Sequence, residues 1–230
     1  MTADLVDVTL DDLTADEVAG VHDRLLAPTF RPDELLTLDE LRSGFTGPGA
    51  APSVVVLADG QPVAVMLGGW FADRRALLLT YLAVDPDARG LGLGTRLLRD
   101  VLGRWAAQEP GALVLAEVDD PRHWPADATQ GDPVARLRFY GRYGARLIPF
   151  PYTQPALRPG ARPVDGMLLL RLDQNPGVPG ETLARFLTEN AAAPGGPAGT
   201  DPALARAVER ARALDLDAAL LPVERWAEVG

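Results

Sequence analysis

The sequence contains no cysteine and no lysine. Without cysteine, the chain can form no disulfide bond, no thiolate metal site and no thiolate nucleophile. Because lysine is absent, all 22 basic residues are arginine. The phosphate loop of nucleoside triphosphate-binding proteins needs a lysine directly after a glycine, so the sequence excludes that class of site.

Long apolar runs and a surplus of positive charge are also missing. No stretch approaches the roughly 18 apolar residues of a membrane helix, and the acidic residues 1–17 lack the basic-then-apolar order of a signal peptide. We therefore expect a cytoplasmic protein without a membrane partner. The net charge of −10 argues against a nucleic-acid partner, because phosphate backbones need clustered basic side chains.

The patterning of residues 1–174 predicts a single α/β (α+β) domain. A Thr14-x-x-Glu17 capping box begins one helix, Pro32 begins a second that runs to Phe45, and two β-rich runs meet in a hairpin at Asp59-Gly60. Further strands are expected at 76–84, 112–118, 145–150 and 166–172, helices after 92 and over 132–143, and a proline-rich loop at 149–163. This order predicts a mixed sheet with helices on both faces.

Residues 175–230 differ from the preceding residues in composition and pattern, and they are predicted to form a linker and a helical C-terminal extension. A helix is expected over 181–193, a glycine-rich linker over 194–200, and a second helix with Asp201 as N-cap and Pro202 at its first position. We expect this extension to pack on the main domain or on a second subunit, and the second arrangement would give a homodimer.

The segment DPDARGLGLGTRLLRDVL, residues 85–102, places glycines 90, 92 and 94 directly before an amphipathic helix. Glycine costs up to about 1 kcal/mol inside a helix, so these glycines indicate that the backbone approaches a ligand closely. Amide groups at a helix N-terminus bind anions without a charged side chain. A simple flexible turn and a dinucleotide-binding loop remain alternatives, although the dinucleotide motif requires glycine where Thr95 stands.

Arg89-x-x-Gly92-x-Gly94 matches the Q/R-x-x-G-x-G/A signature of the GCN5-related N-acetyltransferase (GNAT) superfamily. Over about residues 5–172 the sequence resembles that superfamily. The resemblance implies a mostly antiparallel sheet splayed in the middle and acetyl-coenzyme A (acetyl-CoA) as acyl donor. The cofactor-binding residues that it implies are Leu82, Ala83, Val84, Arg89, Gly90, Leu91, Gly92, Leu93, Gly94 and Thr95. We expect no metal site, because the two histidines, His22 and His123, lie far apart in the sequence.

Phe139-Tyr140-x-x-x-Gly144 resembles a second segment of the same superfamily. The resemblance implies that Tyr140 protonates the departing thiolate, and a phenol with an ordinary pKa near 10 is protonated at neutral pH. The alternative is that Tyr140 only packs its helix onto the sheet. Pro133 and Arg136 depart from the superfamily pattern, which has asparagine and a small residue at these positions.

Acyl transfer to an amine also needs a base that removes a proton from the ammonium group. Glu117, near the end of the strand 112–118, is the first candidate and Asp119 the second. The expected function is therefore transfer of a short acyl group from acyl-CoA to a primary amine of a small molecule or peptide. The alternatives are a catalytically weak CoA-binding regulatory module and a nucleotide-binding oxidoreductase.

Overall fold

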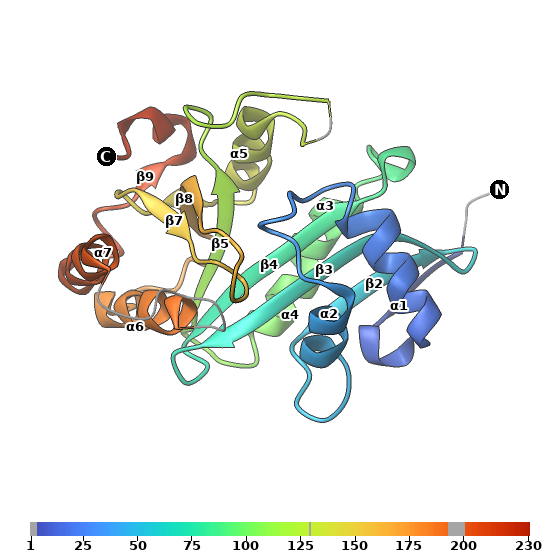
Figure 1. Cartoon of the computed structure of the whole chain (residues 1–230). Coiled ribbons are helices and arrows are strands. Elements are labelled where there is room, and N and C mark those ends of the chain that lie inside the picture. Colours follow the sequence, from blue (N-terminus) through green and yellow to red (C-terminus); the bar gives the residue numbers. More distant parts are fainter. Residues whose placement is uncertain (1–3, 129, 193–200) are drawn as a thin grey trace. The chain divides into compact units, whose positions relative to one another are not determined.

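The computed structural model describes residues 4–128, 130–192 and 201–230 (Figure 1). The chain forms two compact units. Unit 1 comprises Met1–Gly69 and Leu79–Gln108, and unit 2 comprises Trp70–Leu78 and Glu109–Gly230. The strands β3 (Gln61–Phe71) and β4 (Ala76–Val84) pass from one unit into the other.

Unit 1 contains four neighbouring strands in the order β1-β2-β3-β4. The first two are β1 (Leu5–Val8) and β2 (Ser53–Ala58), and the β1–β2 and β2–β3 pairs are antiparallel. Asp59 and Gly60 connect β2 to β3 with φ of 49° and 78°. Both residues adopt the positive φ that a tight two-residue hairpin requires, so the predicted hairpin is confirmed.

The first helix of unit 1, α1 (Ala15–Val21), begins as predicted. The backbone N–H of Thr14 donates to the Glu17 carboxylate at 2.8 Å, which closes the capping box. The predicted start of the second helix at Pro32 is wrong, because α2 spans Leu38–Phe45 with Thr37 as its N-cap. The Tyr81 hydroxyl donates to the carbonyl of Glu34 at 2.6 Å and accepts the N–H of Leu36 at 3.0 Å, and so holds the intervening chain outside a helix.

Helices cover both faces of the unit 1 strands. Val55, Val65 and Tyr81 pack with α1 and α2 in one hydrophobic core. Val54, Val56, Ala64 and Met66 alternate with the first set along β2 and β3 and are also buried. A continuous helix over residues 93–106, composed of α3 (Leu93–Arg96), a π-helical turn (Leu97–Leu102) and α4 (Gly103–Ala106), lies behind the strands in Figure 1.

Unit 2 is built on the strand order β5-β8-β6-β9, with β7 paired to β8. These strands are β5 (Leu113–Asp119), β6 (Arg146–Leu147), β7 (Tyr152–Gln154), β8 (Val164–Arg171) and β9 (Leu221–Pro222). All four of their pairings are antiparallel. The sequence did not predict β7, which lies inside the expected proline-rich loop, or β9, which is only two residues long. The predicted class, a mixed α/β fold with a mostly antiparallel sheet, is confirmed.

The helix α5 (Pro133–Arg142) has the predicted ends. Asp132 caps it by accepting the N–H of Val134 at 2.8 Å, with Pro133 at the first helical position. Gly144, just after the helix, has φ of 96° and satisfies the left-handed termination that glycine favours. The local sequence therefore determined both ends of this helix.

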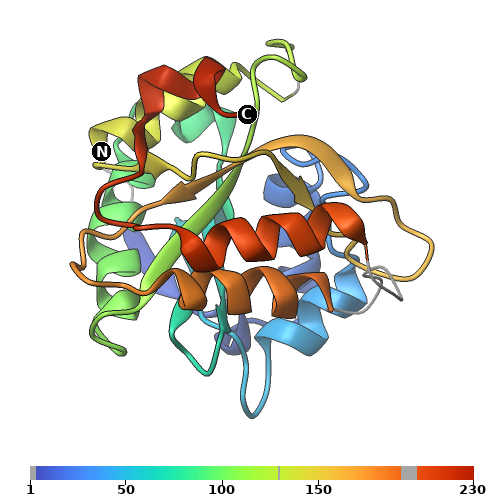
Figure 2. The same cartoon turned by 90° about the vertical axis from the view of Figure 1, so that its left-hand side faces the viewer.

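The C-terminal helices α6 (Gly180–Ala191) and α7 (Pro202–Ala213) lie side by side (Figure 2). Leu183, Phe186 and Ala211 share one core with Leu115 of β5 and Leu169 of β8. Asp201 caps α7 as predicted and accepts the N–H of Ala203 at 2.8 Å. The predicted linker 194–200 lies outside the described residues, and the domain boundary between residues 174 and 175 stays a prediction.

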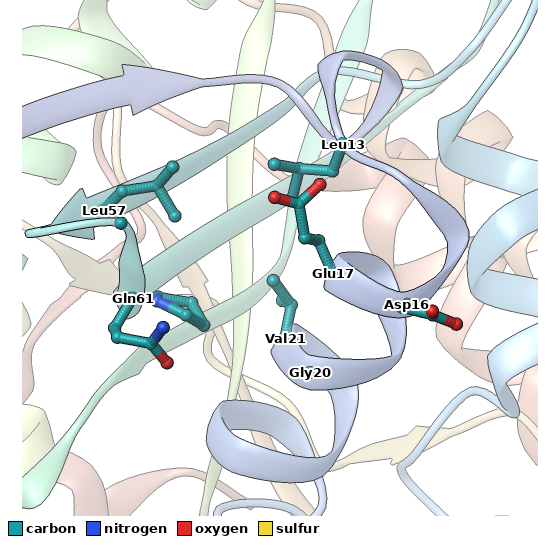
Figure 3. Close-up of a pocket in the computed structure, with 9 residues that line it drawn as sticks. Leu13, Asp16, Glu17, Gly20, Val21, Leu57 and Gln61 are labelled. Carbon is teal, nitrogen blue, oxygen red and sulfur yellow. The ribbon is translucent and has the colours of Figure 1, made fainter.

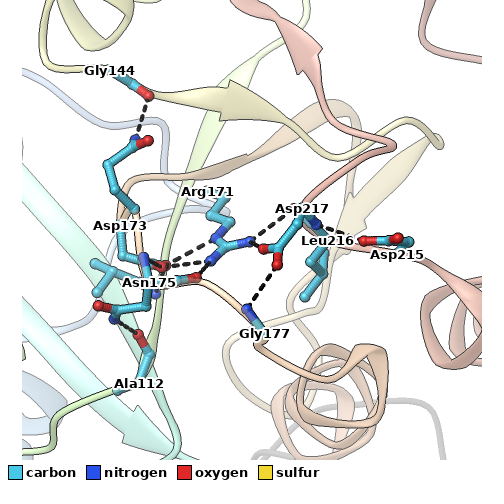
Figure 4. Close-up of polar contacts among 11 residues, drawn as sticks. Ala112, Gly144, Arg171, Asp173, Asn175, Gly177, Asp215, Leu216 and Asp217 are labelled. Atoms are coloured by element: carbon cyan, nitrogen blue, oxygen red, sulfur yellow. Dashed lines mark hydrogen bonds and ion pairs between the residues drawn. The ribbon is translucent and has the colours of Figure 1, made fainter.

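A buried arginine connects the end of β8 to the segment that follows α7 (Figure 4). Arg171, which is 3% exposed, pairs with Asp173 at 2.9 Å and donates to the carbonyl of Leu216 at 2.8 Å. Asp217 lies 3.4 Å from the same guanidinium and accepts the N–H of Gly177 at 2.7 Å. The charge of Arg171 is thus compensated entirely by groups of unit 2.

The turn between β3 and β4 has an unusual backbone. Ala72, Asp73 and Arg74 have φ of 52°, 50° and 63°, a left-handed conformation that costs non-glycine residues roughly 1–2 kcal/mol each. Glu189 of α6 accepts the N–H of Ala72 at 2.5 Å, and Arg185 pairs with Asp73 at 2.6 Å. Helix α6 therefore stabilises this turn.

Candidate functional site

The glycine segment of unit 1 begins at a fixed aspartate. Asp85 accepts the N–H of Asp87 at 2.9 Å and pairs with Arg24 Nε, also at 2.9 Å. The hydrogen bond from Asp87 and then the one from Arg24 lower the pKa of Asp85 below its ordinary value. The Asp85 carboxylate therefore fixes the start of the glycine segment through these two contacts.

The segment itself exposes its backbone. Gly90 and Gly92 have φ of 84° and 77°, and a Cβ atom at either position would meet nothing within 4 Å. The first hydrogen bond of the following helix runs from Arg96 N–H to Gly92 O at 2.9 Å. Within the described residues, the N–H groups of residues 93–95 have no backbone acceptor. Unsatisfied amides beside open space are chemically suited to a pyrophosphate, so the residues present fit the predicted donor.

Tyr140 lies in unit 2 on α5 and is only 6% exposed. Burial raises the pKa of Tyr140 to about 12, although the nearby charge of Arg136 acts in the opposite direction. Within the described residues, the hydroxyl has no hydrogen-bond partner. The phenol is therefore neutral at physiological pH, and its hydroxyl proton is not donated to any protein acceptor within the described residues.

Glu117, on β5 of unit 2, is part of a polar network. The hydroxyl of Tyr152 on β7 donates to the Glu117 carboxylate, and Asn190 Nδ2 of α6 donates to the Tyr152 hydroxyl at 2.9 Å. Asn190 also approaches the carboxylate, at 3.4 Å. Burial, and then the charge of Glu117, raise the pKa of Tyr152 well above its ordinary value. Tyr152 therefore remains a hydrogen-bond donor, which stabilises the charged form of the carboxylate.

The second candidate base, Asp119, forms an ion pair with an arginine. Its side chain is 5% exposed and accepts a hydrogen bond from Arg136 at 2.6 Å. The neighbouring Asp120, 3% exposed, pairs with Arg122 at 2.6 Å. Each of these two carboxylates is paired with an arginine, which reduces its ability to accept a proton from a ligand.

A hollow of about 250 Å³ in unit 1 lies between α1 and the β2–β3 hairpin (Figure 3). Its wall includes Leu13, Val21 and Leu57, with two acids, Asp16 and Glu17. The Glu17 carboxylate serves the capping box. Because Glu17 is engaged in the capping box, Asp16 is the remaining acid of this wall, and we do not regard the hollow as a candidate catalytic site.

The sequence identified Glu117 and Tyr140 but not Asn190. Asn190 stands near the end of an amphipathic helix, where a polar residue is ordinary. Only the packing of α6 against the strands of unit 2 brings it to Tyr152. No local signal in the sequence marks this contact.

Residues 19–128 match the model of the acetyltransferase (GNAT) family. This range is slightly less than half of the chain. It includes the glycine segment and Glu117, whereas Tyr140 lies beyond it. No curated protein sequence matches the chain.

Solved structures resemble the chain in fold. A GNAT-family protein from Bacteroides thetaiotaomicron is 21% identical, with a TM-score of 0.52 over 73% of this chain and 85% of that protein. The ribosomal-protein-S18-alanine N-acetyltransferase from Escherichia coli is 16% identical, with a TM-score of 0.50 over 74% and 93%. An acyl-CoA N-acyltransferase from Pseudomonas aeruginosa is 15% identical, with a TM-score of 0.50 over 75% and 100%. The resemblance to the GNAT superfamily and the mostly antiparallel sheet that it implies are confirmed.

Two further properties bear on the class of site. Among residues 4–128, 130–192 and 201–230, no three histidine, cysteine, aspartate or glutamate side chains are grouped so that they could hold a metal ion. The described part of the chain also has no helix with the length and apolarity needed to cross a bilayer.

Proposed function

Starting from the GNAT acetyltransferase match, we propose that the chain transfers an acetyl or other short acyl group from acyl-CoA to a primary amine. The observation that carries this proposal is the glycine segment. Within the described residues its N–H groups at residues 93–95 have no backbone acceptor, and they lie beside open space. This segment lies inside the residues that match the family. Direct attack by the amine in a ternary complex is the expected route, because the chain has no cysteine to carry an acyl group.

The donor side uses backbone groups. The amides that follow Gly92 would hold the pyrophosphate, and the backbone of residues 82–84 in β4 would pair with the pantetheine arm. When bound, acyl-CoA supplies an activated thioester. A backbone N–H of the same strand would polarise the thioester carbonyl, which stabilises negative charge on its oxygen.

Proton transfers are assigned to two side chains. Glu117 accepts a proton from the acceptor ammonium, which frees the nitrogen lone pair for attack on the acyl carbon. A carbon–nitrogen bond forms and the carbon–sulfur bond breaks. The neutral Tyr140 then donates its hydroxyl proton to the thiolate sulfur, in accordance with its pKa of about 12. The nitrogen loses its second proton to solvent when the amide forms, and solvent also takes the proton from Glu117 and returns one to Tyr140, so that one proton is released per turnover.

Release of free thiol from acetyl-CoA in the presence of a panel of primary amines tests the proposal. Wild-type protein should release thiol, and Tyr140→Phe should lower kcat by roughly 10²–10⁴-fold. CoA affinity, measured by calorimetry, should be the same in both proteins. CoA binding without thiol release for any amine would instead identify a CoA-binding module, and binding of NADH but not CoA would identify a nucleotide-binding oxidoreductase.

A further inference from the structure

A cavity of about 480 Å³ lies within unit 2, between the β7 region and the two C-terminal helices. Cavities of roughly 300–1,000 Å³ are typical of small-molecule sites. Tyr152 and Thr153 of β7 line one side, and residues of α6 and α7 line the other. The proposed acyl-transfer chemistry does not by itself account for this cavity.

The walls are largely apolar. Pro151, Pro155 and Pro163 form part of the strand side, where proline restricts the backbone and favours a preformed surface. On the helix side, Leu187 and Leu204 contribute apolar surface. Ala207, a small residue, leaves space that a larger side chain would fill. The cavity therefore suits a compact apolar group.

The polar part of the wall favours a positive charge. Asp165 and Asp201 line the cavity, together with a single arginine, Arg162. The Asp165 carboxylate accepts the Thr153 hydroxyl at 2.8 Å, and Asp201 accepts the N–H of Ala203 at 2.8 Å. Both acids are bound by neutral donors in these contacts, which do not neutralise their negative charge.

Tyr152 connects the cavity wall to Glu117. It lines the cavity, and its hydroxyl donates to the Glu117 carboxylate. Asn190, which donates to the same hydroxyl at 2.9 Å, lies in α6 between Leu187 and Ala191, two residues of the cavity wall. The wall of the cavity and the carboxylate thus belong to one hydrogen-bonded arrangement within unit 2.

We propose that this cavity binds the apolar body of the acceptor, an arylalkyl or alkyl primary amine, and that Tyr152 and Asn190 position the Glu117 carboxylate for it. The reaction of the bound amine rests on the proposed function, whereas its binding does not. The C-terminal helices are therefore part of the acceptor site.

The binding test uses phenethylamine as the probe and one substitution at two positions of α7. Ala207→Phe fills the cavity, and Ala205→Phe places the same side chain on the exposed surface of the same helix. Calorimetry should show phenethylamine binding to wild type and Ala205→Phe, and binding weakened roughly tenfold or more in Ala207→Phe. The neutral analogue 2-phenylethanol should bind wild type more weakly. Equal phenethylamine affinity in both variants, or no binding to wild type, would overturn the proposal.

A kinetic test addresses the positioning residues. With acetyl-CoA and phenethylamine, Ala207→Phe should raise KM with little change in kcat, whereas Tyr152→Phe and Asn190→Ala should lower kcat by about tenfold or more. The acid limb of the pH–rate profile should also move in the last two variants, and the donor-retaining Asn190→Gln should recover part of kcat. Unchanged kcat and pH profile in Tyr152→Phe would overturn the positioning role. If wild type showed no CoA binding or no thiol release, the proposed function would be contradicted instead. Phenethylamine binding depends on neither property, so the two failures can be distinguished.

Discussion

A Cβ atom on Gly180, the first residue of α6, would lie 2.3 Å from the backbone oxygen of Ala211 near the end of α7. The carbonyl oxygens of Leu214 and Arg212 would lie at 2.7 and 2.9 Å. The first turn of α6 therefore approaches the last carbonyls of α7 with no room for a side chain. Oppositely charged helix ends meet at this contact, which is electrostatically favourable.

Gly180→Ala should lower the free energy of unfolding by about 1–3 kcal/mol, because the backbone of α7 must shift to admit the methyl group. Urea unfolding followed by circular dichroism measures this loss. Gly20→Ala, in α1, is the matched control, since a Cβ atom there meets nothing within 4 Å. In an open helical position the same substitution should stabilise by about 0.5–1 kcal/mol. Equal effects at both positions would contradict the close contact.

Asp173→Ala should be strongly destabilising. Arg171 and Asp173 have side chains only 4% and 6% exposed, and the Asp173 carboxylate also accepts the N–H of Val114 at 2.7 Å. Removal of the closer acidic partner leaves the buried charge of Arg171 with Asp217 at 3.4 Å and with backbone carbonyls, and loss of a buried partner costs roughly 3–5 kcal/mol. Glu228→Ala breaks the Arg225–Glu228 pair, whose side chains are each 52% exposed, and should leave the unfolding midpoint unchanged. A small effect of Asp173→Ala would show that water or another group compensates Arg171.

Gly92→Ala should weaken CoA binding about tenfold or more, because an alanine at φ of 77° is strained and its methyl group would occupy the space beside the amides. Gly49→Ala is the control, since Gly49 has φ of 83° and equally open surroundings but lies outside the glycine segment. Both variants should lose about 1–2 kcal/mol of stability, whereas only Gly92→Ala should change CoA affinity. Calorimetric titration with CoA distinguishes the two effects, and equal CoA affinities would exclude this segment as the donor site.

The phenol of Tyr140 should remain protonated beyond the range in which an ordinary tyrosine ionises. Its pKa in the folded protein is about 12, whereas an unfolded chain has a value near 10. The associated stability is present below about pH 10 and is lost as the pH rises towards 12. Ultraviolet titration of wild type and Tyr140→Phe should therefore give the same tyrosinate absorbance up to about pH 10.5. A difference of one tyrosine at that pH would show that Tyr140 is not buried.

Local signals in the sequence predicted helix ends well. Thr14, Asp132 and Asp201 cap their helices through contacts no more than three residues away, so the information lies in adjacent positions. The start of α2 was predicted wrongly although a local signal marks it, the capping box of Thr37 and Glu40. The hydrogen bond that keeps Leu36 outside the helix is accepted by Tyr81, 45 residues away. Strand β7 escaped prediction because proline-rich composition argues against a strand, whereas pairing with β8 decides the outcome.

The candidate site shows the same division between local and distant information. The place of Glu117 near a strand end led to its prediction as a base, and the family resemblance of the glycine segment led to the prediction of residues 89–95. The groups that hold Glu117 come from positions 35 and 73 residues further along the chain. Only the fold brings them together, and the roles of Glu117 and Tyr140 in catalysis stay predictions.

The left-handed turn at residues 72–74 has a consequence for biosynthesis. Two of its stabilising side chains, Arg185 and Glu189, are made more than a hundred residues later. A growing chain therefore emerges from the ribosome with this turn held only by nearer groups, such as Glu109, which pairs with Arg74. The contacts from α6 can form only after residue 189 has left the exit tunnel, so we expect this connection to reach its native structure late in the folding of unit 2.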